Sequence, residues 1–353
     1  MKKKRIAINA LLLFAGLIVS GCGKKVTVNI DDGMSYIEAL DYQNALLSFE
    51  KAVESGEDPE SAYRGAGIAH MGMTNYEEAI DSFEKALQSS DMFVDDVEYD
   101  ISYYLATAKY KNNDPAGAVA VLDHIIALRP RDEQALFLRG SIKALGDSYE
   151  QGLDDLEQAM LLSGKNVERV IGVFKVLKAA GHETEGREYL NNVLGDTSLH
   201  MTDYESGRIY YYMEDYENAR NSLEQARISN KEKKYDEADI ILMLGQTYEQ
   251  LGDKNYAAGL YEDFISENGE QEEICNQLGL CKLDTGDYEA ALSAFQSALS
   301  VGKGNLQSLK FNEIVAYEHL GQFTKAKLLM ESYLKEYPDD AEAKREYEFL
   351  KTR

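Results

Sequence analysis

The chain has 353 residues, with 37 Lys and Arg against 62 Asp and Glu, and a formal net charge of −25 at pH 7. So acidic a protein repels phosphate backbones and anionic headgroups, which excludes nucleic acid as a partner and favours a neutral or basic polypeptide. It contains only 4 Pro, and its many Ala, Leu, Glu and Lys residues favour α-helix along nearly the whole chain.

The first 21 residues have the composition of an export signal. The cationic MKKKR is followed by an apolar stretch, residues 6–19, that is too short to span a bilayer comfortably. The next residues, VSGC at 19–22, resemble the lipobox of bacterial lipoproteins, in which the Cys is acylated and becomes the first residue after cleavage. We therefore expect residues 1–21 to be a lipoprotein signal peptide, Cys22 to be lipidated and residues 22–32 to form the tether. An ordinary signal peptide or an uncleaved anchor is the alternative.

The lipobox also implies a location. Several acyl chains, each contributing about 0.8 kcal/mol per buried methylene, hold a protein at a bilayer without a transmembrane helix. We expect the protein on the extracytoplasmic face of the cell membrane, or on the outer membrane if the host has two. Few residues separate Cys22 from the body of the chain, which should therefore lie close to the bilayer.

After the tether the sequence repeats itself. NYEEAIDSFEKAL at residues 75–87 returns as DYEAALSAFQSAL at residues 287–299, with its Tyr, Ala, Phe and Ala in the same register. Nine such segments align on the residue after a short turn, and the aligned residues are 33 to 39 positions apart, with 34 in four of the eight steps. The aligned residues are Tyr42, Tyr76, Pro115, Tyr149, Glu183, Tyr216, Lys254, Tyr288 and Phe323.

A period of 34 residues with a helix–turn–helix pattern is typical of the tetratricopeptide repeat family. Residues 26–338 resemble that family in nine repeats, and in repeat two Gly67, Ala79 and Phe83 fill its small and aromatic sites. Antiparallel helices approach closely only where one side chain is nearly absent, so a small residue is needed beside each large one. The resemblance implies an all-α fold, a right-handed superhelical solenoid of about nine repeats over residues 33–353 with a C-terminal capping helix.

Several repeats depart from the family pattern, and the departures in repeats five and one carry structural expectations. In repeat five, Glu183 and Gly186 occupy the turn aromatic and small sites, and we expect a flexible joint there. Repeat one is incomplete, since residues 26–28 favour extended backbone and Asp31 or Asp32 is expected to cap the first helix.

The chain offers no converging catalytic or metal-binding groups, so we expect no enzyme, no cofactor and no metal. Its 5 His are scattered without a His-x-x-x-His pair, and it has no Gly-x-Ser-x-Gly elbow. Cys275 and Cys281 are interpreted as small buried apolar residues, too far apart on one helix for a disulfide. An enzyme built from scattered carboxylates is an alternative, which a close buried Asp/Glu pair in a groove would support.

Tyrosine is abundant, with 24 copies. The resemblance implies a partner-binding groove lined by the first helices, at positions 2, 5, 9, 12 and 13 of each repeat. Tyrosine suits such a surface, because it offers a large apolar face at little entropic cost and a hydroxyl that fixes orientation. For each ring the alternative is packing between repeats. The residues assigned to the groove are Tyr103, Tyr110, Phe137, Tyr204, Arg208, Tyr211, Tyr212 and Phe311.

Together these features predict a membrane-anchored, extracytoplasmic scaffold or assembly factor that binds a protein or peptide in its concave groove and catalyses nothing. A cell-envelope glycan-binding lipoprotein is the alternative, since tyrosine rings and acids also suit sugars.

Overall fold

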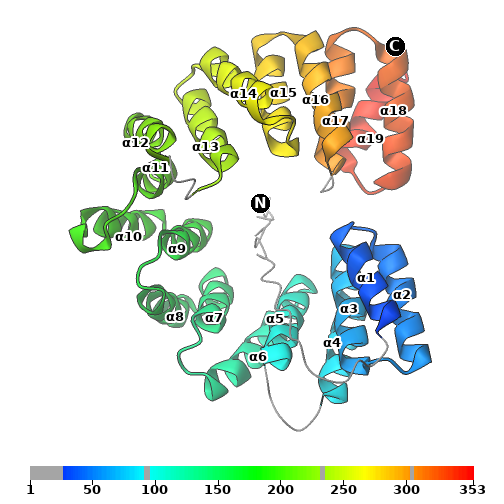
Figure 1. The fold of residues 1–353 in the computed structure, drawn as a ribbon, viewed down its shortest axis with the longest axis vertical. Coiled ribbons are helices and arrows are strands. Elements are labelled where there is room, and N and C mark those ends of the chain that lie inside the picture. Colours follow the sequence, from blue (N-terminus) through cyan, green and yellow to red (C-terminus); the bar gives the residue numbers. More distant parts are fainter. Residues whose placement is uncertain (1–26, 91–95, 231–234, 303–305) are drawn as a thin grey trace. The chain divides into compact units, whose positions relative to one another are not determined.

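The computed structural model describes residues 27–90, 96–230, 235–302 and 306–353. These residues form 19 α-helices and one short 3-10 helix, with no β-strand among them (Figure 1). The chain divides between Val193 and Leu194 into two compact parts, called here the N-terminal unit and the C-terminal unit. The predicted signal peptide, residues 1–21, and the predicted lipidation site, Cys22, lie outside the described residues.

Each unit is a run of helical hairpins. The N-terminal unit holds α1 (Val28–Glu38), α2 (Tyr42–Ser55), α3 (Pro59–Gly72), α4 (Tyr76–Ser89), α5 (Asp96–Lys111), α6 (Pro115–Leu128), α7 (Glu133–Leu145), α8 (Tyr149–Leu162), α9 (Val167–Ala179) and all but the end of α10 (Glu183–Gly195). The C-terminal unit holds η1 (Thr197–Leu199), α11 (Asp203–Tyr212), α12 (Tyr216–Ser229), α13 (Glu237–Gln250), α14 (Lys254–Asn268), α15 (Glu272–Thr285), α16 (Tyr288–Val301), α17 (Leu306–His319), α18 (Phe323–Glu336) and α19 (Ala341–Leu350).

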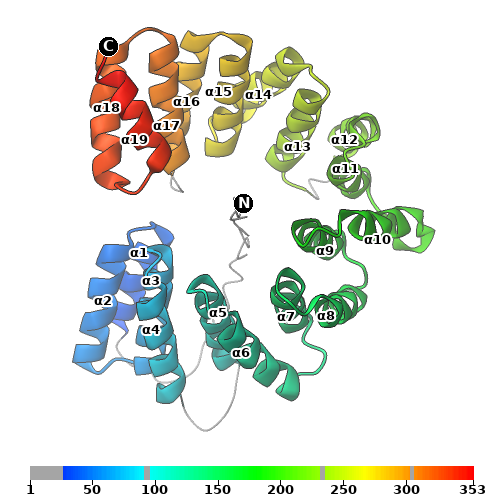
Figure 2. The same ribbon diagram turned by 180° about the vertical axis from the view of Figure 1, so that it is seen from behind.

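The helices confirm the predicted repeat. The odd-numbered helices α1 to α17 are the first helices of the nine repeats, and the even-numbered helices α2 to α18 are the second helices. Every second helix begins at the turn residue on which the sequence was aligned, from Tyr42 in α2 to Phe323 in α18. Figure 2 shows the same hairpins from behind. The chain is therefore an all-α repeat solenoid. No helix in the described ranges is long and apolar enough to cross a membrane.

Glycine opposite an aromatic ring holds the hairpins together. A Cβ atom on Gly67 would lie 2.4 Å from the Phe83 ring, which is fully buried. In repeat one, Phe49 lies against Gly33 of its own repeat and also against Gly65 of the next, where added Cβ atoms would lie 2.6 and 2.3 Å from the ring. Because the Phe49 ring packs against both glycines, it joins repeat one to repeat two. Contacts of this kind make the hydrophobic core continuous from one repeat to the next.

Aspartate side chains fix where several second helices begin. The carboxylates of Asp41, Asp215 and Asp287 accept hydrogen bonds from backbone N–H groups in the first turns of α2, α12 and α16. Such caps satisfy donors that a helix start leaves unpaired, and each contributes about 1 kcal/mol. The turn is thus specified locally, which explains why the predicted helix starts are correct.

The structure differs from the expectation at the start of repeat one. Residues 28–32, assigned to the tether, form the first turns of α1, and neither Asp31 nor Asp32 is its N-cap residue, which is Thr27. The cap comes from a distant residue, since the Glu57 carboxylate accepts hydrogen bonds from the backbone N–H groups of Asn29 and Ile30 at 3.2 and 3.1 Å. This tertiary contact overrides the local preference for extended backbone.

Repeat five forms a complete hairpin despite its departures from the pattern. Gly186 fills the small site, where an added Cβ would lie 3.0 Å from the Phe174 ring. Glu183, in place of the turn aromatic, binds Lys178 and Arg187 at 3.2 and 2.7 Å. The division between the two units follows directly after this repeat, in the last turn of α10. A flexible joint at this place stays a prediction.

Helix α19 covers the end of the C-terminal unit. It packs against α18, with Ala343 and Leu350 fully buried. Its cap residue is Asp340, which accepts hydrogen bonds from the N–H groups of Glu342 and Ala343, and from the Tyr333 hydroxyl at 2.6 Å. A terminal helix of this kind shields the apolar face that the last repeat would otherwise expose.

Candidate partner-binding surface

The eight residues assigned to the groove lie on first helices in both units. Tyr103 and Tyr110 on α5 and Phe137 on α7 belong to the N-terminal unit, and the other five, on α11 and α17, belong to the C-terminal unit. First helices also contact neighbouring first helices, as α7 does α9 and α13 does α15. Each unit therefore presents a surface of its own built from first helices.

In the N-terminal unit, Tyr103 is an inter-repeat contact. Its hydroxyl donates a hydrogen bond to Asp132, the N-cap residue of α7 in the next repeat. Burial, together with the adjacent Asp132 carboxylate, raises the pKa of Tyr103 above its ordinary value. The hydroxyl stays protonated and joins repeats three and four. Tyr110, at the end of α5, is half-buried, as Tyr103 is.

Phe137 has a similar structural role. An added Cβ on Gly172 of α9 would lie 3.1 Å from its ring. The Arg169 guanidinium lies over the same ring, 4.0 Å from its centroid, and also binds Glu133. A cation over an aromatic face contributes about 0.5–2 kcal/mol. The ring therefore helps to join repeats four and five.

The position-5 rings of the C-terminal unit are likewise used for packing. Tyr204 is only 8% exposed and lies 4.7 Å from the Tyr235 ring, centroid to centroid. Phe311 is partly buried in the cluster beneath α19, 5.8 Å from the Tyr333 ring. Arg208 lies over the Tyr204 ring at 5.7 Å. Tyr204 therefore packs between repeats, whereas Phe311 packs on α18 of its own repeat and Arg208 on a ring of its own helix.

Tyr211 and Tyr212 remain at the surface as half-buried rings at the end of α11. Tyr211 meets Tyr212 edge to face at 5.7 Å and Tyr216 at the same distance, so that three tyrosines form one cluster. Burial raises the pKa of Tyr211, with smaller contributions from Tyr216, Tyr212 and Glu249. We call Tyr211, Tyr212, Tyr216 and Glu249 the tyrosine cluster.

Glu249 gives this cluster its negative charge. Its carboxylate, on α13 of the next repeat, accepts a hydrogen bond at 2.8 Å from the Tyr261 hydroxyl, whose ring is fully buried. Sequence reasoning missed Tyr216 and Glu249 as members of the surface. The repeat pattern assigns Tyr216 only to the turn, and the sequence does not indicate that α13 brings Glu249 close to α11.

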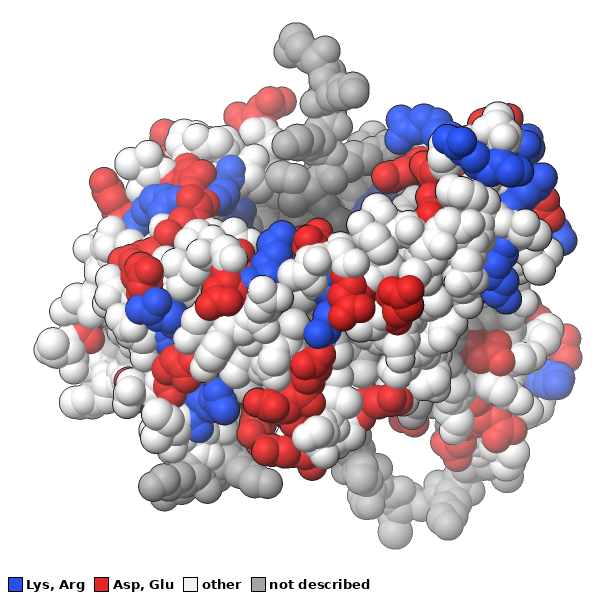
Figure 3. Space-filling view, turned by 90° about the horizontal axis from the view of Figure 1, so that it is seen from above, with Lys and Arg blue, Asp and Glu red and all other residues white. Residues whose placement is uncertain are grey.

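Charge alone does not locate a site. On the face seen in Figure 3, acidic side chains are spread among basic and uncharged ones. Within the described residues, no group of three His, Cys, Asp or Glu side chains could hold a metal ion. Burial raises the pKa of Cys281 to about 12, with a smaller contribution from Glu249, so this thiol is held protonated. Cys281 is therefore not a reactive thiol.

One close carboxyl pair does exist, between Glu318 on α17 and Glu346 on α19. The two share a hydrogen bond, and Glu318 Oε1 is buried without a hydrogen-bond partner. Burial and the neighbouring Glu346 raise the pKa of Glu318 to about 8. Carboxyl groups in direct hydrogen bond lie closer than the roughly 5 Å or more that separates the pair of a glycosidase. The pair therefore does not suit cleavage of a glycan.

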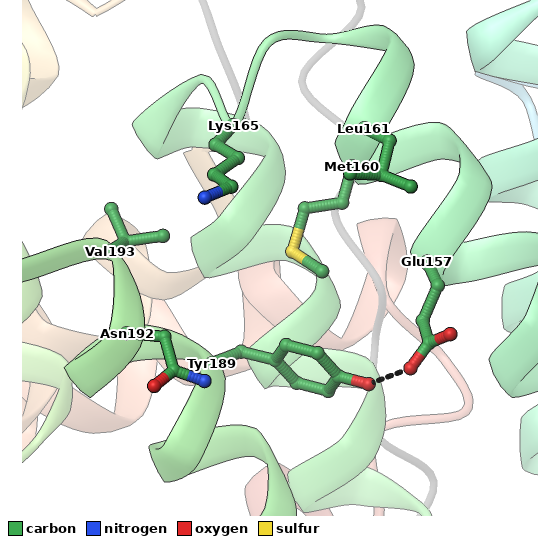
Figure 4. A pocket seen from close by; sticks show the side chains of 7 residues that line it. All are labelled: Glu157, Met160, Leu161, Lys165, Tyr189, Asn192 and Val193. Atoms are coloured by element: carbon green, nitrogen blue, oxygen red, sulfur yellow. Dashed lines mark hydrogen bonds between the residues drawn. The ribbon is translucent and has the colours of Figure 1, made fainter. Parts of the chain in front are cut away.

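Two surface cavities lie away from the assigned groove residues. One, of about 340 Å³, is lined by Glu331, Leu334, Lys335 and Tyr347 in the C-terminal unit. The other, of about 290 Å³, lies between α8 and α10 in the N-terminal unit (Figure 4). Both are formed by residues of second helices, the loops after them or the terminal helix, where the sequence carried no signal of a site.

Comparison with known proteins supports the repeat assignment. The model of the tetratricopeptide repeat family matches residues 31–92, 103–165, 204–273 and 276–341. No curated protein matches the chain. Among solved structures, it is similar to a tetratricopeptide repeat protein from Parabacteroides merdae ATCC 43184, with a TM-score of 0.44 and 15% identity over 82% of this chain and 97% of that one.

The chain is similar at a comparable level to two further solved structures. MamA from Desulfovibrio magneticus RS-1 has a TM-score of 0.42 and 17% identity, over 49% of this chain and 96% of its own. YrrB, described as a repeat protein with an unusual peptide-binding site, has a TM-score of 0.39 and 20% identity, over 57% of this chain and 92% of its own.

Proposed function

Because the chain belongs to the tetratricopeptide repeat family, we propose that it is a scaffold or assembly factor that binds a neutral or basic protein or peptide. Repeats of this family present surfaces for partner proteins rather than catalytic centres. The observation that carries the proposal is the tyrosine cluster, in which Tyr211, Tyr212 and Tyr216 stand together at the surface beside Glu249.

The chemistry of the tyrosine cluster fits a basic or neutral segment. Half-buried tyrosine rings bury large apolar area on contact, and their negative faces attract cations. The carboxylate of Glu249 beside Tyr211 adds to that attraction. The net charge of −25 raises the local concentration of basic partners and disfavours acidic ones. Tyr211 and Tyr212 are thus the rings we assign to partner contact.

The scaffold is proposed to act at a membrane surface. The lipobox at residues 19–22 supports acylation of Cys22 and an extracytoplasmic location. α1 begins at Val28, so only a few residues would separate the lipid from the first repeat. Such a short tether would keep the binding surface close to other envelope proteins.

The experiment replaces both half-buried rings, as Tyr211→Ala with Tyr212→Ala, and captures partners by cross-linking in the native host followed by mass spectrometry. We expect the wild-type partner to be lost or strongly reduced, with the melting temperature nearly unchanged. The matched control is Tyr36→Ala, which removes a tyrosine that is 39% exposed on another first helix. Unchanged partner recovery would refute the proposal, and a large fall in melting temperature would show that the rings belong to the core.

A glycan partner is the second candidate, since the same rings and carboxylate could stack on and hydrogen-bond to sugars. Titration of the purified chain with cell-wall polysaccharide separates the two. Binding of polysaccharide that the double variant abolishes, with no protein captured in the host, would favour the glycan.

A further inference from the structure

Glu249 lies where four helices of the C-terminal unit meet. It is in the last turn of α13, which contacts α11, α14 and α15 (Figure 1). Tyr211 of α11 interacts electrostatically with its carboxylate, and Tyr261 of α14 and Cys281 of α15 form hydrogen bonds to it. Repeats six, seven and eight therefore converge on this one acidic side chain of the tyrosine cluster.

Two buried donors hold the Glu249 carboxylate in place. The Tyr261 hydroxyl donates to Oε1 at 2.8 Å, and the Cys281 thiol is hydrogen-bonded to the same carboxylate. Burial raises the pKa of both donors above their ordinary values, that of Cys281 to about 12, so each keeps its proton at neutral pH. Because both donors are uncharged, they orient the carboxylate without neutralising it.

Glu249 has no counter-ion among the described residues. No Lys or Arg in the described ranges forms an ion pair with it, and the nearby Lys254 binds Asp284 instead. The side chain is half-buried, so water screens its charge less than it screens that of a fully exposed carboxylate. Such a group attracts a cation from another molecule.

The rings beside Glu249 also lack a cation. Elsewhere in the chain, basic side chains lie over tyrosine faces, as the Arg129 guanidinium does over Tyr99 at 3.5 Å from the ring centroid. Within the part of the chain that the structure describes, no basic side chain lies over the Tyr211 or Tyr216 ring. The planes of these two rings meet at 68°. Differently oriented aromatic faces and a carboxylate therefore lie together without a positive charge.

An arginine side chain suits both features at once. Its guanidinium is planar and always charged, stacks on aromatic faces, and can donate two parallel hydrogen bonds to one carboxylate. A carboxylate has about four acceptor sites, of which Tyr261 and Cys281 use two, so two remain for the guanidinium. A lysine ammonium is a more strongly hydrated point charge and gains less from the rings. A neutral sugar would leave Glu249 without a counter-ion.

We propose that the tyrosine cluster binds an arginine side chain of the partner polypeptide, with the guanidinium on Glu249 and against the Tyr211 ring. This inference rests on the proposed function, and it narrows the partner from a basic or neutral segment to one type of contact residue. Tyr261 and Cys281 are positioning residues, because both are fully buried and act on the partner only through Glu249.

The test measures binding of a pentapeptide, Gly-Phe-Arg-Phe-Gly, to the full chain in detergent by fluorescence polarisation. The peptide is labelled at its N-terminus and amidated at its C-terminus, so that no terminal charge takes part. In a second peptide, citrulline replaces the arginine with a neutral group of similar shape. We expect the arginine peptide to bind at least about tenfold more tightly, because only it forms a hydrogen-bonded charge pair. Glu249→Gln should lower its affinity to that of the citrulline peptide and leave the latter unaffected.

Glu224→Gln is the matched control. Glu224 is also half-buried and accepts a hydrogen bond from the Tyr248 hydroxyl at 2.9 Å, but it lies on the second helix α12 and is not part of the tyrosine cluster. Its replacement should leave both affinities unaltered. Tyr261→Phe should weaken the arginine peptide about threefold in the otherwise unchanged chain, and should have no effect in the Glu249→Gln background, because it acts through that carboxylate.

Equal binding of the two peptides, no binding of either, or full binding of the arginine peptide by Glu249→Gln would overturn the proposal. An effect of Tyr261→Phe that persists in the Glu249→Gln background would overturn the positioning role. Cross-linking in the host keeps this test separate from that of the proposed function. If Glu249→Gln still captures the partner that Tyr211→Ala with Tyr212→Ala loses, the scaffold proposal stands and arginine recognition is wrong.

Discussion

Arg139 and Asp155 form a bidentate ion pair between α7 and α8, with Nε to Oδ2 at 2.7 Å and Nη2 to Oδ1 at 2.6 Å. The Asp155 side chain is only 6% exposed. Asp155 lies on the helix face where α8 crosses α7 beside Gly140, and the guanidinium is held there by the carboxylate. The hairpin of repeat four is thus joined by charge as well as by small-residue packing.

Removing one partner of this pair should destabilise the fold. Asp155→Asn keeps the shape of the side chain but leaves a largely buried guanidinium without its strongest partner, so we expect the free energy of unfolding to fall by about 3 kcal/mol. Urea denaturation followed by circular dichroism measures it. Asp123→Asn removes a second contact of Arg139 from a carboxylate that is 53% exposed, and should cost less than about 1 kcal/mol. Equal effects of the two changes would contradict this account.

The Gly67 and Phe83 contact predicts coupled effects in repeat two. Phe83→Ala removes a fully buried ring and should cost about 3–5 kcal/mol. Gly67→Ala places a Cβ 2.4 Å from the ring and should cost about 1–3 kcal/mol by overpacking. In the double variant the added methyl meets no ring, so its cost should shrink or vanish. A double-mutant cycle from denaturant midpoints measures this, and additive costs would show that the two residues do not meet.

The repeat was predictable because its determinants are local. Gly67 and Phe83 are close in sequence and recur with a fixed spacing, and cap residues such as Asp41 lie directly before the helices that they start. Each of these features acts within one hairpin, so a single sequence contains all that is needed to recognise it.

The site was less predictable, because it depends on contacts between repeats. Tyr103 is hydrogen-bonded to Asp132, and Tyr204 packs on Tyr235, each about one repeat further along. A single sequence does not indicate which side chain of the next repeat contacts a given ring. The start of α1 was not predictable for the same reason, since its cap is Glu57, in the loop between α2 and α3.

Anchoring through Cys22 makes a direct prediction. Cys22→Ser removes the only thiol that the lipobox can acylate, so the protein should leave the membrane fraction. Cell fractionation with a carbonate wash measures it, and intact-mass spectrometry should show the acyl mass on the wild type alone. Cys275→Ala removes a fully buried thiol with the lipobox intact, and should stay in the membrane fraction. If the Cys22→Ser variant stays in the membrane fraction, the lipoprotein assignment is wrong.

The Glu318 and Glu346 pair should make the end of the C-terminal unit sensitive to pH. Burial and Glu346 raise the pKa of Glu318 to about 8 in the folded chain, whereas an unfolded glutamate has a pKa near 4.3. Between these values the folded chain holds a proton that the unfolded chain has released. The free energy of unfolding should therefore fall as the pH rises from about 4.3 to about 8.

Glu318→Gln tests this, because the amide keeps a donor for Glu346 and cannot ionise. We expect the melting temperature of the wild type to fall between pH 5 and pH 8.5 more steeply than that of the variant, and the variant to be the more stable of the two at pH 8.5. Glu348→Gln changes an exposed residue of the same helix α19, and should keep the wild-type slope. If Glu318→Gln keeps that slope as well, Glu318 does not hold its proton in the folded chain.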